Sequence, residues 1–167
     1  MRKAGASTLL LFVLLLLQSC YSFSGSSLPE HLKTVAIPVF EDRSGAGIAQ
    51  YRAELTKGLV NKIESQSNLR CTSELGRADA LVIGRIISFS DAPSYLSGTT
   101  ERALKNRITI VVDVIMEERG NKVPLFAKSY VGFADYPVGN YVAQQEAVRL
   151  SLHQIIEDIF DRIISGW

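Results

Sequence analysis

The sequence predicts an α+β fold, in which two helices pack on one face of a mixed, mostly antiparallel four-stranded sheet. Three observations favour this class. Residues 104–117 alternate strictly in polarity, as a strand with one buried and one wetter face does. Two segments, residues 47–66 and the chain from Asn140 almost to Trp167, carry apolar stripes with helical spacing. The elements follow in the order β-α-β-β-β-α, which indicates helices layered on a sheet.

The first 19 residues predict a secretory signal peptide. Arg2 and Lys3 supply the positive start, and an unbroken apolar run covers residues 9–17. This run is too short for a permanent membrane span, which needs about 20 apolar residues. The segment ends in Leu17-Gln18-Ser19-Cys20, which resembles the lipobox of bacterial lipoproteins. An ordinary signal peptide followed by a chance cysteine is the alternative.

The lipobox resemblance implies that Cys20 is the lipidation site. In that class of proteins the thiol receives a diacylglyceryl group, the leader is cut before the cysteine, and the new amino terminus is acylated. Several acyl chains together anchor a protein stably without a membrane-spanning helix. Tyr21 follows the cysteine where an Asp would direct retention in the inner membrane. The expected location is therefore the periplasmic face of the outer membrane.

After the leader, residues 20–32 predict a lipidated, Ser-rich tether, and residues 33–167 predict a single α+β domain. Loss of Arg2 and Lys3 changes the formal net charge from +1 to −1. A duplex-binding surface normally shows a clear basic excess, so no nucleic-acid partner is expected. With Cys20 lipidated, Cys71 has no partner for an internal disulfide.

The first half of the domain predicts a strand, a helix and a short second strand. Residues 33–40 are rich in β-branched residues, with Val35, Ile37 and Val39 on one face. Residues 41–47 carry Asp, Ser and two glycines, which is typical of a loop. The helix then covers residues 47–66, and residues 69–73 predict a short strand.

The second half predicts an antiparallel meander and a closing helix. Residues 80–89 are almost continuously apolar, and residues 90–103, with Pro93 and Gly98, predict a polar loop. The strand at 104–117 turns at 118–124, centred on Gly120-Asn121, and returns at 125–134. Asn140 is a suitable N-cap for the last helix.

Signatures of catalysis are absent from the sequence. The two histidines, His31 and His153, stand in no Cys/His/carboxylate cluster with metal-ligand spacing. The chain has neither a G-x-S-x-G elbow nor a phosphate-binding glycine loop. Glu117, Glu118 and Asp135 are typical of solvated residues at strand ends. We therefore expect no enzyme activity, no metal and no cofactor.

Two sequence segments resemble the lipopolysaccharide-assembly lipoprotein family LptE. They are Cys20-Tyr21-Ser22-Phe23-Ser24-Gly25 and Leu32-Lys33-Thr34-Val35-Ala36-Ile37-Pro38-Val39-Phe40-Glu41. The order of helices and strands agrees over nearly the whole mature chain. The resemblance implies a non-enzymatic protein that plugs the outer-membrane β-barrel LptD, helps that barrel to assemble, and binds lipopolysaccharide for insertion into the outer leaflet.

Two other classes share part of this pattern. Lipoproteins that activate peptidoglycan synthases, and curli-secretion-type lipoproteins, also begin with an anchor, a similar first strand and a helix. They continue with further alternating βα units, whereas this sequence predicts a meander and one closing helix. An anchored hydrolase is disfavoured because no nucleophile and base can be paired.

One basic cluster is a candidate site for lipopolysaccharide. Arg102, Lys105 and Arg107 lie within six residues, with Glu101 as the only acid. The alternation places Lys105 and Arg107 on one strand face, toward one end of the sheet. Arginine and lysine there could make charge-assisted hydrogen bonds to the phosphates of lipid A. The alternative is an ordinary solvated strand face that protects an edge from aggregation.

Overall fold

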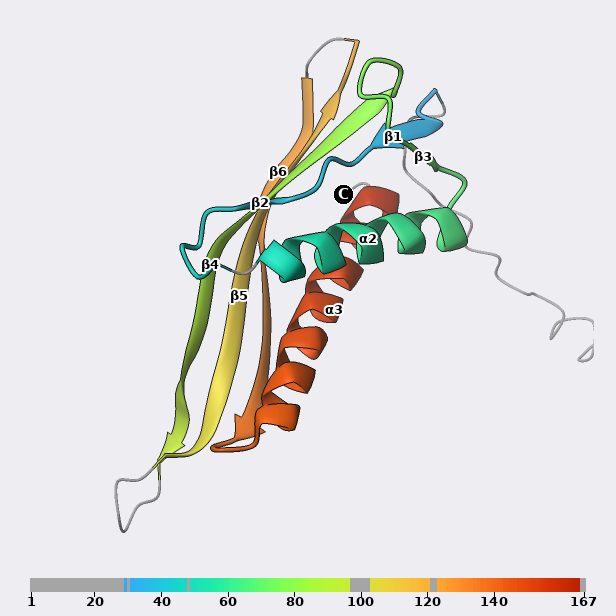
Figure 1. The fold of residues 1–167 in the computed structure, drawn as a ribbon. Coiled ribbons are helices and arrows are strands. Elements are labelled where there is room, and N and C mark those ends of the chain that lie inside the picture. The colour runs from blue at the N-terminus through green and yellow to red at the C-terminus, as the bar shows by residue number, and fades with distance from the viewer. Residues whose placement is uncertain (1–28, 30, 48, 97–102, 121–122, 166–167) are drawn as a thin grey trace, which may run out of the picture.

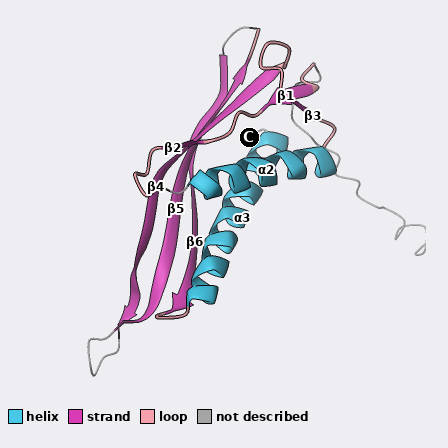
Figure 2. Ribbon diagram, in the orientation of Figure 1, coloured by secondary structure: helices cyan, strands magenta, loops and turns pink. Residues whose placement is uncertain are grey.

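Three long antiparallel strands form the body of the protein (Figures 1 and 2). They are β4 (Ala80–Leu96), β5 (Ala103–Glu118) and β6 (Val123–Pro137). The computed structural model describes residues 29, 31–47, 49–96, 103–120 and 123–165. At about 3.3 Å per residue, strands of this length extend for roughly 50 Å. The meander therefore has two ends that lie far apart.

Three short strands join this meander in parallel. β1 (Thr34–Ala36) lies between β3 (Arg70–Thr72) and β4, and β2 (Glu41–Asp42) pairs with β4 further along. The sheet order is β3-β1-β4-β5-β6, with β2 beside β4. Two helices, α2 (Ala49–Gln66) and α3 (Tyr141–Ser165), lie on the same face of this sheet (Figure 2).

The predicted α+β class, the mixed sheet and the two helices are confirmed, but the strand count is wrong. Within the described residues the sheet has six strands, not four. The predicted strand at 33–40 is confirmed only as β1, which ends at Ala36, because Pro38 has no N–H to donate to a ladder. β2 lies in the segment 41–47 that was predicted as a loop. Between the two strands Phe40 turns inward and Val39 outward, contrary to the expected common face of Val35, Ile37 and Val39.

The predicted loop at 90–103 is also wrong in its first half, where β4 continues to Leu96. Two features explain why the sequence pattern did not predict this part of the strand. A bulge at Ile87 shifts the pairing with β5. Before the bulge the buried positions are even-numbered, whereas beyond it the side chain that packs against the core is the partly buried Phe89. Beyond β2, β4 is an edge strand, and an edge strand accepts a proline such as Pro93.

The core lies between the inner face of the sheet and the two helices. Even-numbered residues of β5 from Ile108 to Met116 are at most 1% exposed, as the predicted alternation requires. The helices contribute their own apolar stripes. Those of α2 and α3 that are almost completely enclosed are Leu55, Leu59, Ile63, Leu152, Ile155, Ile159 and Ile163.

α3 lies directly against the backbone of β6 at Gly132. A Cβ atom at Gly132 would lie 2.0 Å from the carbonyl oxygen of Ser151, so only glycine fits beneath the helix. Ser151 is fully buried and donates its hydroxyl to the carbonyl of Ala147 at 2.8 Å. On the other side of α3, Lys62 of α2 pairs with Glu157 at 2.7 Å. These contacts join α3 to β6 on one side and to α2 on the other.

We predict that Gly132→Ala lowers the free energy of unfolding by at least about 2 kcal/mol, because a backbone carbonyl cannot rotate away from the new methyl group. Urea unfolding followed by circular dichroism measures this loss. Gly76→Ala is the matched control, since the nearest atom to its added Cβ is 3.9 Å away. Equal stability of the two variants would contradict the close packing of α3 on β6.

Candidate functional site

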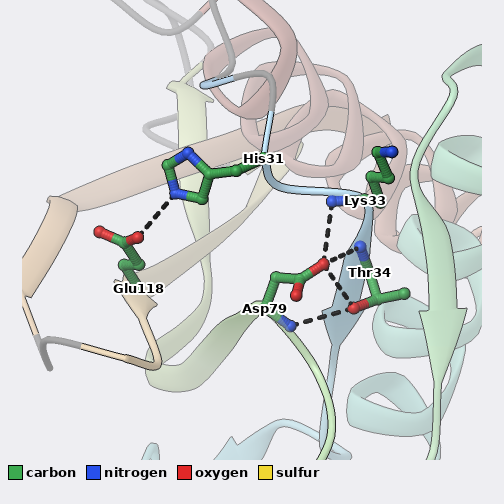
Figure 3. A network of polar contacts seen from close by, with 5 residues as sticks. All are labelled: His31, Lys33, Thr34, Asp79 and Glu118. Atoms are coloured by element: carbon green, nitrogen blue, oxygen red, sulfur yellow. Dashed lines mark hydrogen bonds and ion pairs between the residues drawn. The ribbon is translucent and has the colours of Figure 1, made fainter.

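The described chain enters the fold at one end of the sheet, where Asp79 holds the start of β1 (Figure 3). The Asp79 carboxylate accepts hydrogen bonds from the backbone N–H groups of Lys33 at 3.0 Å and Thr34 at 2.8 Å. It also accepts the Thr34 hydroxyl at 2.8 Å, and these three donors hold the pKa of Asp79 below its usual range. Asp79 therefore fixes the place from which the preceding chain departs.

Two further contacts attach residues 31 and 32 to the same place. Leu32 is buried in the core, and the His31 ring lies 2.7 Å from the carboxylate of Glu118 at the end of β5. We call this region, around His31, Lys33, Asp79 and Glu118, the tether end. The signal peptide, Cys20 and most of the predicted tether lie outside the described residues, so their roles remain predictions.

The opposite end of the meander is where β5 begins, β6 ends and α3 begins (Figure 1). A tight turn joins β6 to α3: the Asn140 N–H donates to the Pro137 carbonyl at 3.2 Å, and Gly139 has a positive φ of 81°. The Asn140 side chain accepts the Ala143 N–H at 3.0 Å, which confirms Asn140 as the N-cap. We call residues 104–107 and 135–142 the distal end.

Arg107 is paired within the distal end. Its guanidinium donates two hydrogen bonds to Asp135 of β6, from Nε at 2.7 Å and Nη2 at 3.0 Å. The same group lies over the ring of Phe133, 4.8 Å from its centre. The paired guanidinium holds the pKa of Asp135 below its usual range. Sequence analysis did not pair these residues, because one residue of register decides which β6 residue faces Arg107.

Lys105 is the cation of the predicted cluster that keeps its ammonium group available. It lies on the outer, exposed side of β5, two residues before Arg107. No residue of the described ranges forms an ion pair or hydrogen bond with its Nζ atom. Arg102 lies outside the described residues. The structure thus brings Lys105 and Arg107 to one exposed strand face, and their role in binding remains a prediction.

The inner side of the sheet near the distal end carries a polar network that sequence analysis missed. Asp91 accepts hydrogen bonds from the Tyr136 hydroxyl at 2.5 Å, from Gln144 at 2.7 Å and from Asn106 at 3.1 Å. Asp91 belongs to the part of β4 predicted as loop, so no sequence pattern pointed to it. The network connects all three long strands to the first turns of α3.

In the part of the chain that the structure describes, no three His, Cys, Asp or Glu side chains gather as metal ligands. None of its helices combines the length and the hydropathy needed to span a bilayer. Burial, with Glu64 nearby, raises the pKa of the Cys71 thiol to about 11, so the reactive thiolate is scarce at neutral pH.

The family comparison extends over nearly the whole described region. Residues 32–165 match the model of the family described as "LptE: Lipopolysaccharide-assembly". The match begins at the buried Leu32 and ends with α3, so it covers every helix and strand of the structure. The comparison with curated protein sequences found no match.

Solved structures of bacterial proteins have a similar fold. A DUF330 protein of Xanthomonas campestris gives a TM-score of 0.64 at 11% identity, covering 81% of this chain and 85% of its own. A homologue of a neuraminyllactose-binding hemagglutinin from Helicobacter pylori gives 0.58 at 11%, covering 86% and 89%. A minor lipoprotein from Acinetobacter baumannii gives 0.53 at 13%, covering 83% and 95%. At these identities the likeness concerns the fold alone.

The Arg107–Asp135 pair predicts a pH dependence. Because the folded-state pKa of Asp135 is lowered, the pair contributes above the ordinary carboxyl pKa of about 4, and its contribution is lost as the pH falls through the lowered value. We expect the Asp135 carboxyl, followed by carbon-13 NMR, to titrate below model peptides.

Arg107→Gln should raise this midpoint more than Lys105→Gln does, because Arg107 donates two hydrogen bonds to the carboxylate, whereas Lys105 acts on Asp135 only through its charge. A wild-type midpoint at the ordinary value, or equal effects of the two substitutions, would contradict the paired geometry.

Proposed function

Since this chain belongs to the LptE family of lipopolysaccharide-assembly proteins, we propose that it binds lipopolysaccharide at its distal end while held in an LptD-type outer-membrane β-barrel. In this proposal the protein is non-enzymatic and acts by binding. It is anchored in the outer membrane through lipidated Cys20, faces the periplasm, and lies inside the partner barrel. Lipopolysaccharide and the barrel are its partners.

The observation that carries the binding proposal is the exposed pair of cations on the outer side of β5. Lys105 offers an ammonium group, and Arg107 presents a guanidinium already oriented by Asp135. Phosphate binds such a guanidinium more strongly than water does, because two N–H groups of the guanidinium match two phosphate oxygens. Together these groups suit the phosphorylated end of a glycolipid.

The position of these cations supports the proposal further. Lys105 and Glu118 stand near opposite ends of β5, about 40 Å apart along the strand. Asp79 and Leu32 fix the tether at the Glu118 end. A protein anchored there by its lipid would present Lys105 and Arg107 well away from its own anchor, as a carrier that delivers lipid toward another leaflet requires.

The outer face of the sheet favours an enclosing partner. Antiparallel sheets commonly leave one face to water, and that face is then polar. Here Val131 and Phe133 of β6 are each about half exposed, and Ile87 of the β4 bulge is 40% exposed. An apolar outer face at mid-strand suits contact with a second protein surface, such as the inner wall of a barrel.

The test measures lipopolysaccharide binding by the full chain purified from membranes. We expect Lys105→Gln together with Arg107→Gln to weaken binding about tenfold or more, since each cation supplies a charge-assisted hydrogen bond. Asp135→Asn should strengthen binding, because it removes the carboxylate that competes for Arg107. Added salt should weaken binding by the wild type more than by the double variant.

Arg77→Gln is the matched control, because Arg77 is an exposed arginine whose partner, Glu74, lies outside the distal end. Binding that is unchanged in the double variant, or equally weakened by Arg77→Gln, would contradict the proposed site. Copurification of the native protein with a peptidoglycan synthase in place of a large β-barrel would contradict the proposed partner.

A further inference from the structure

The distal end also carries a group of exposed apolar side chains that the cation site leaves unexplained. Leu104 and Val138 are each about half exposed, Tyr141 is 71% exposed and Val142 is 79% exposed. Single exposed apolar residues are normal on a soluble protein, but a group of four at one end indicates a binding surface. We call these four residues the apolar group.

Three members of the apolar group, Val138, Tyr141 and Val142, lie in a stretch without charge. Residues 137–145 contain no acidic or basic residue, although 21% of the chain is charged. The neighbouring carboxylate, Asp91, is engaged by Tyr136 and Gln144. The surface around these side chains is therefore suited to an apolar ligand and avoids charges that such a ligand would desolvate.

Hydrogen bonds hold the backbone of this surface in a fixed shape. The Val138 N–H donates to the carbonyl of Leu104 at 3.3 Å, which joins β5 to the turn. The turn is closed between Pro137 and Asn140, and the Asn140 side chain then caps α3. Leu104, Val138 and the first turn of α3 are thus presented together and do not depend on a free loop end.

The cations and the apolar group lie on opposite sides of the same strand end. Successive residues of β5 point to opposite faces, so Lys105 and Arg107 face outward, whereas Leu104 has the parity of the helix-covered face. Val138, Tyr141 and Val142 follow at the start of α3, which lies on that inner side. A ligand at this end meets positive charge on one side and apolar surface on the other.

We propose that the apolar group binds acyl chains of the same glycolipid whose phosphates contact Lys105 and Arg107. This inference rests on the proposed function and adds to it a separate site for the lipid part. An amphiphile with phosphates next to the origin of its acyl chains matches the two sides of the strand end, because both chemistries are then satisfied by one molecule. A purely apolar partner would leave the cations unused, and a free phosphate would leave the apolar group unused.

The test compares two probes on the full chain purified from membranes: lipopolysaccharide, and the phosphorylated saccharide left after complete deacylation. The variant is Tyr141→Ser with Val142→Ser, because these two side chains are the most exposed of the group and contribute least to the core. We expect at least a tenfold weaker affinity for lipopolysaccharide and an unchanged affinity for the deacylated saccharide. Lys105→Gln should weaken the binding of both probes.

Leu150→Ser is the matched control, since Leu150 is a half-exposed apolar residue of α3 outside the distal end, and it should change neither affinity. The inference is overturned if the double variant binds lipopolysaccharide as the wild type does, or loses both probes equally. It is also overturned if phosphatidylglycerol vesicles bind in the same variant-dependent way, because the ligand would then be any anionic lipid surface. A wild type that binds neither probe contradicts the proposed function itself.

Discussion

The close approach of α3 to the backbone of β6 at Gly132 fixes the position of α3, on which the packing of α2 and the shape of the distal end depend. A helix that lies directly on a strand buries Ser151 and Ile155 against the sheet and leaves no room for a side chain beneath it. α2 then packs on α3, with Lys62 and Glu157 between them. Because α3 starts immediately after β6, its fixed position also fixes the turn at Pro137–Asn140 and hence the distal end.

Hydrophobic alternation predicted the elements that have one buried face and one exposed face. The strand at 104–117 and the N-cap at Asn140 are confirmed, because each depends on local chemistry. The strand at 90–96 was missed for two reasons. The bulge at Ile87 changes which residues of β4 face inward, and an edge strand tolerates Pro93. The first strand ends at Ala36, before Pro38, whose effect on pairing depends on the neighbouring strand.

The contacts of the candidate site also depend on strand register, which hydrophobic alternation does not predict. A turn centred on Gly120-Asn121 would place residue 107 opposite residue 134. A register shift between Met116 and Glu117 moves the pairing by one residue, so that Arg107 faces Asp135. Sequence analysis therefore identified Lys105 and Arg107 as neighbours on one face, but it could not find the carboxylate that orients Arg107. The sequence did not predict the apolar group either, because its residues come from β5, a turn and α3 and meet only in the folded chain.

The two ends of the meander differ in their chemistry. The tether end is held by backbone hydrogen bonds to Asp79, whereas the distal end combines available charge with exposed apolar side chains. Site-specific photocrosslinking in living cells tests this account most directly, with a photoreactive residue placed at Val142 or at Leu75, which is half exposed and lies outside the distal end. We expect crosslinks to lipopolysaccharide from position 142 and none from position 75. Crosslinks from position 75 alone, or from both positions equally, would contradict it.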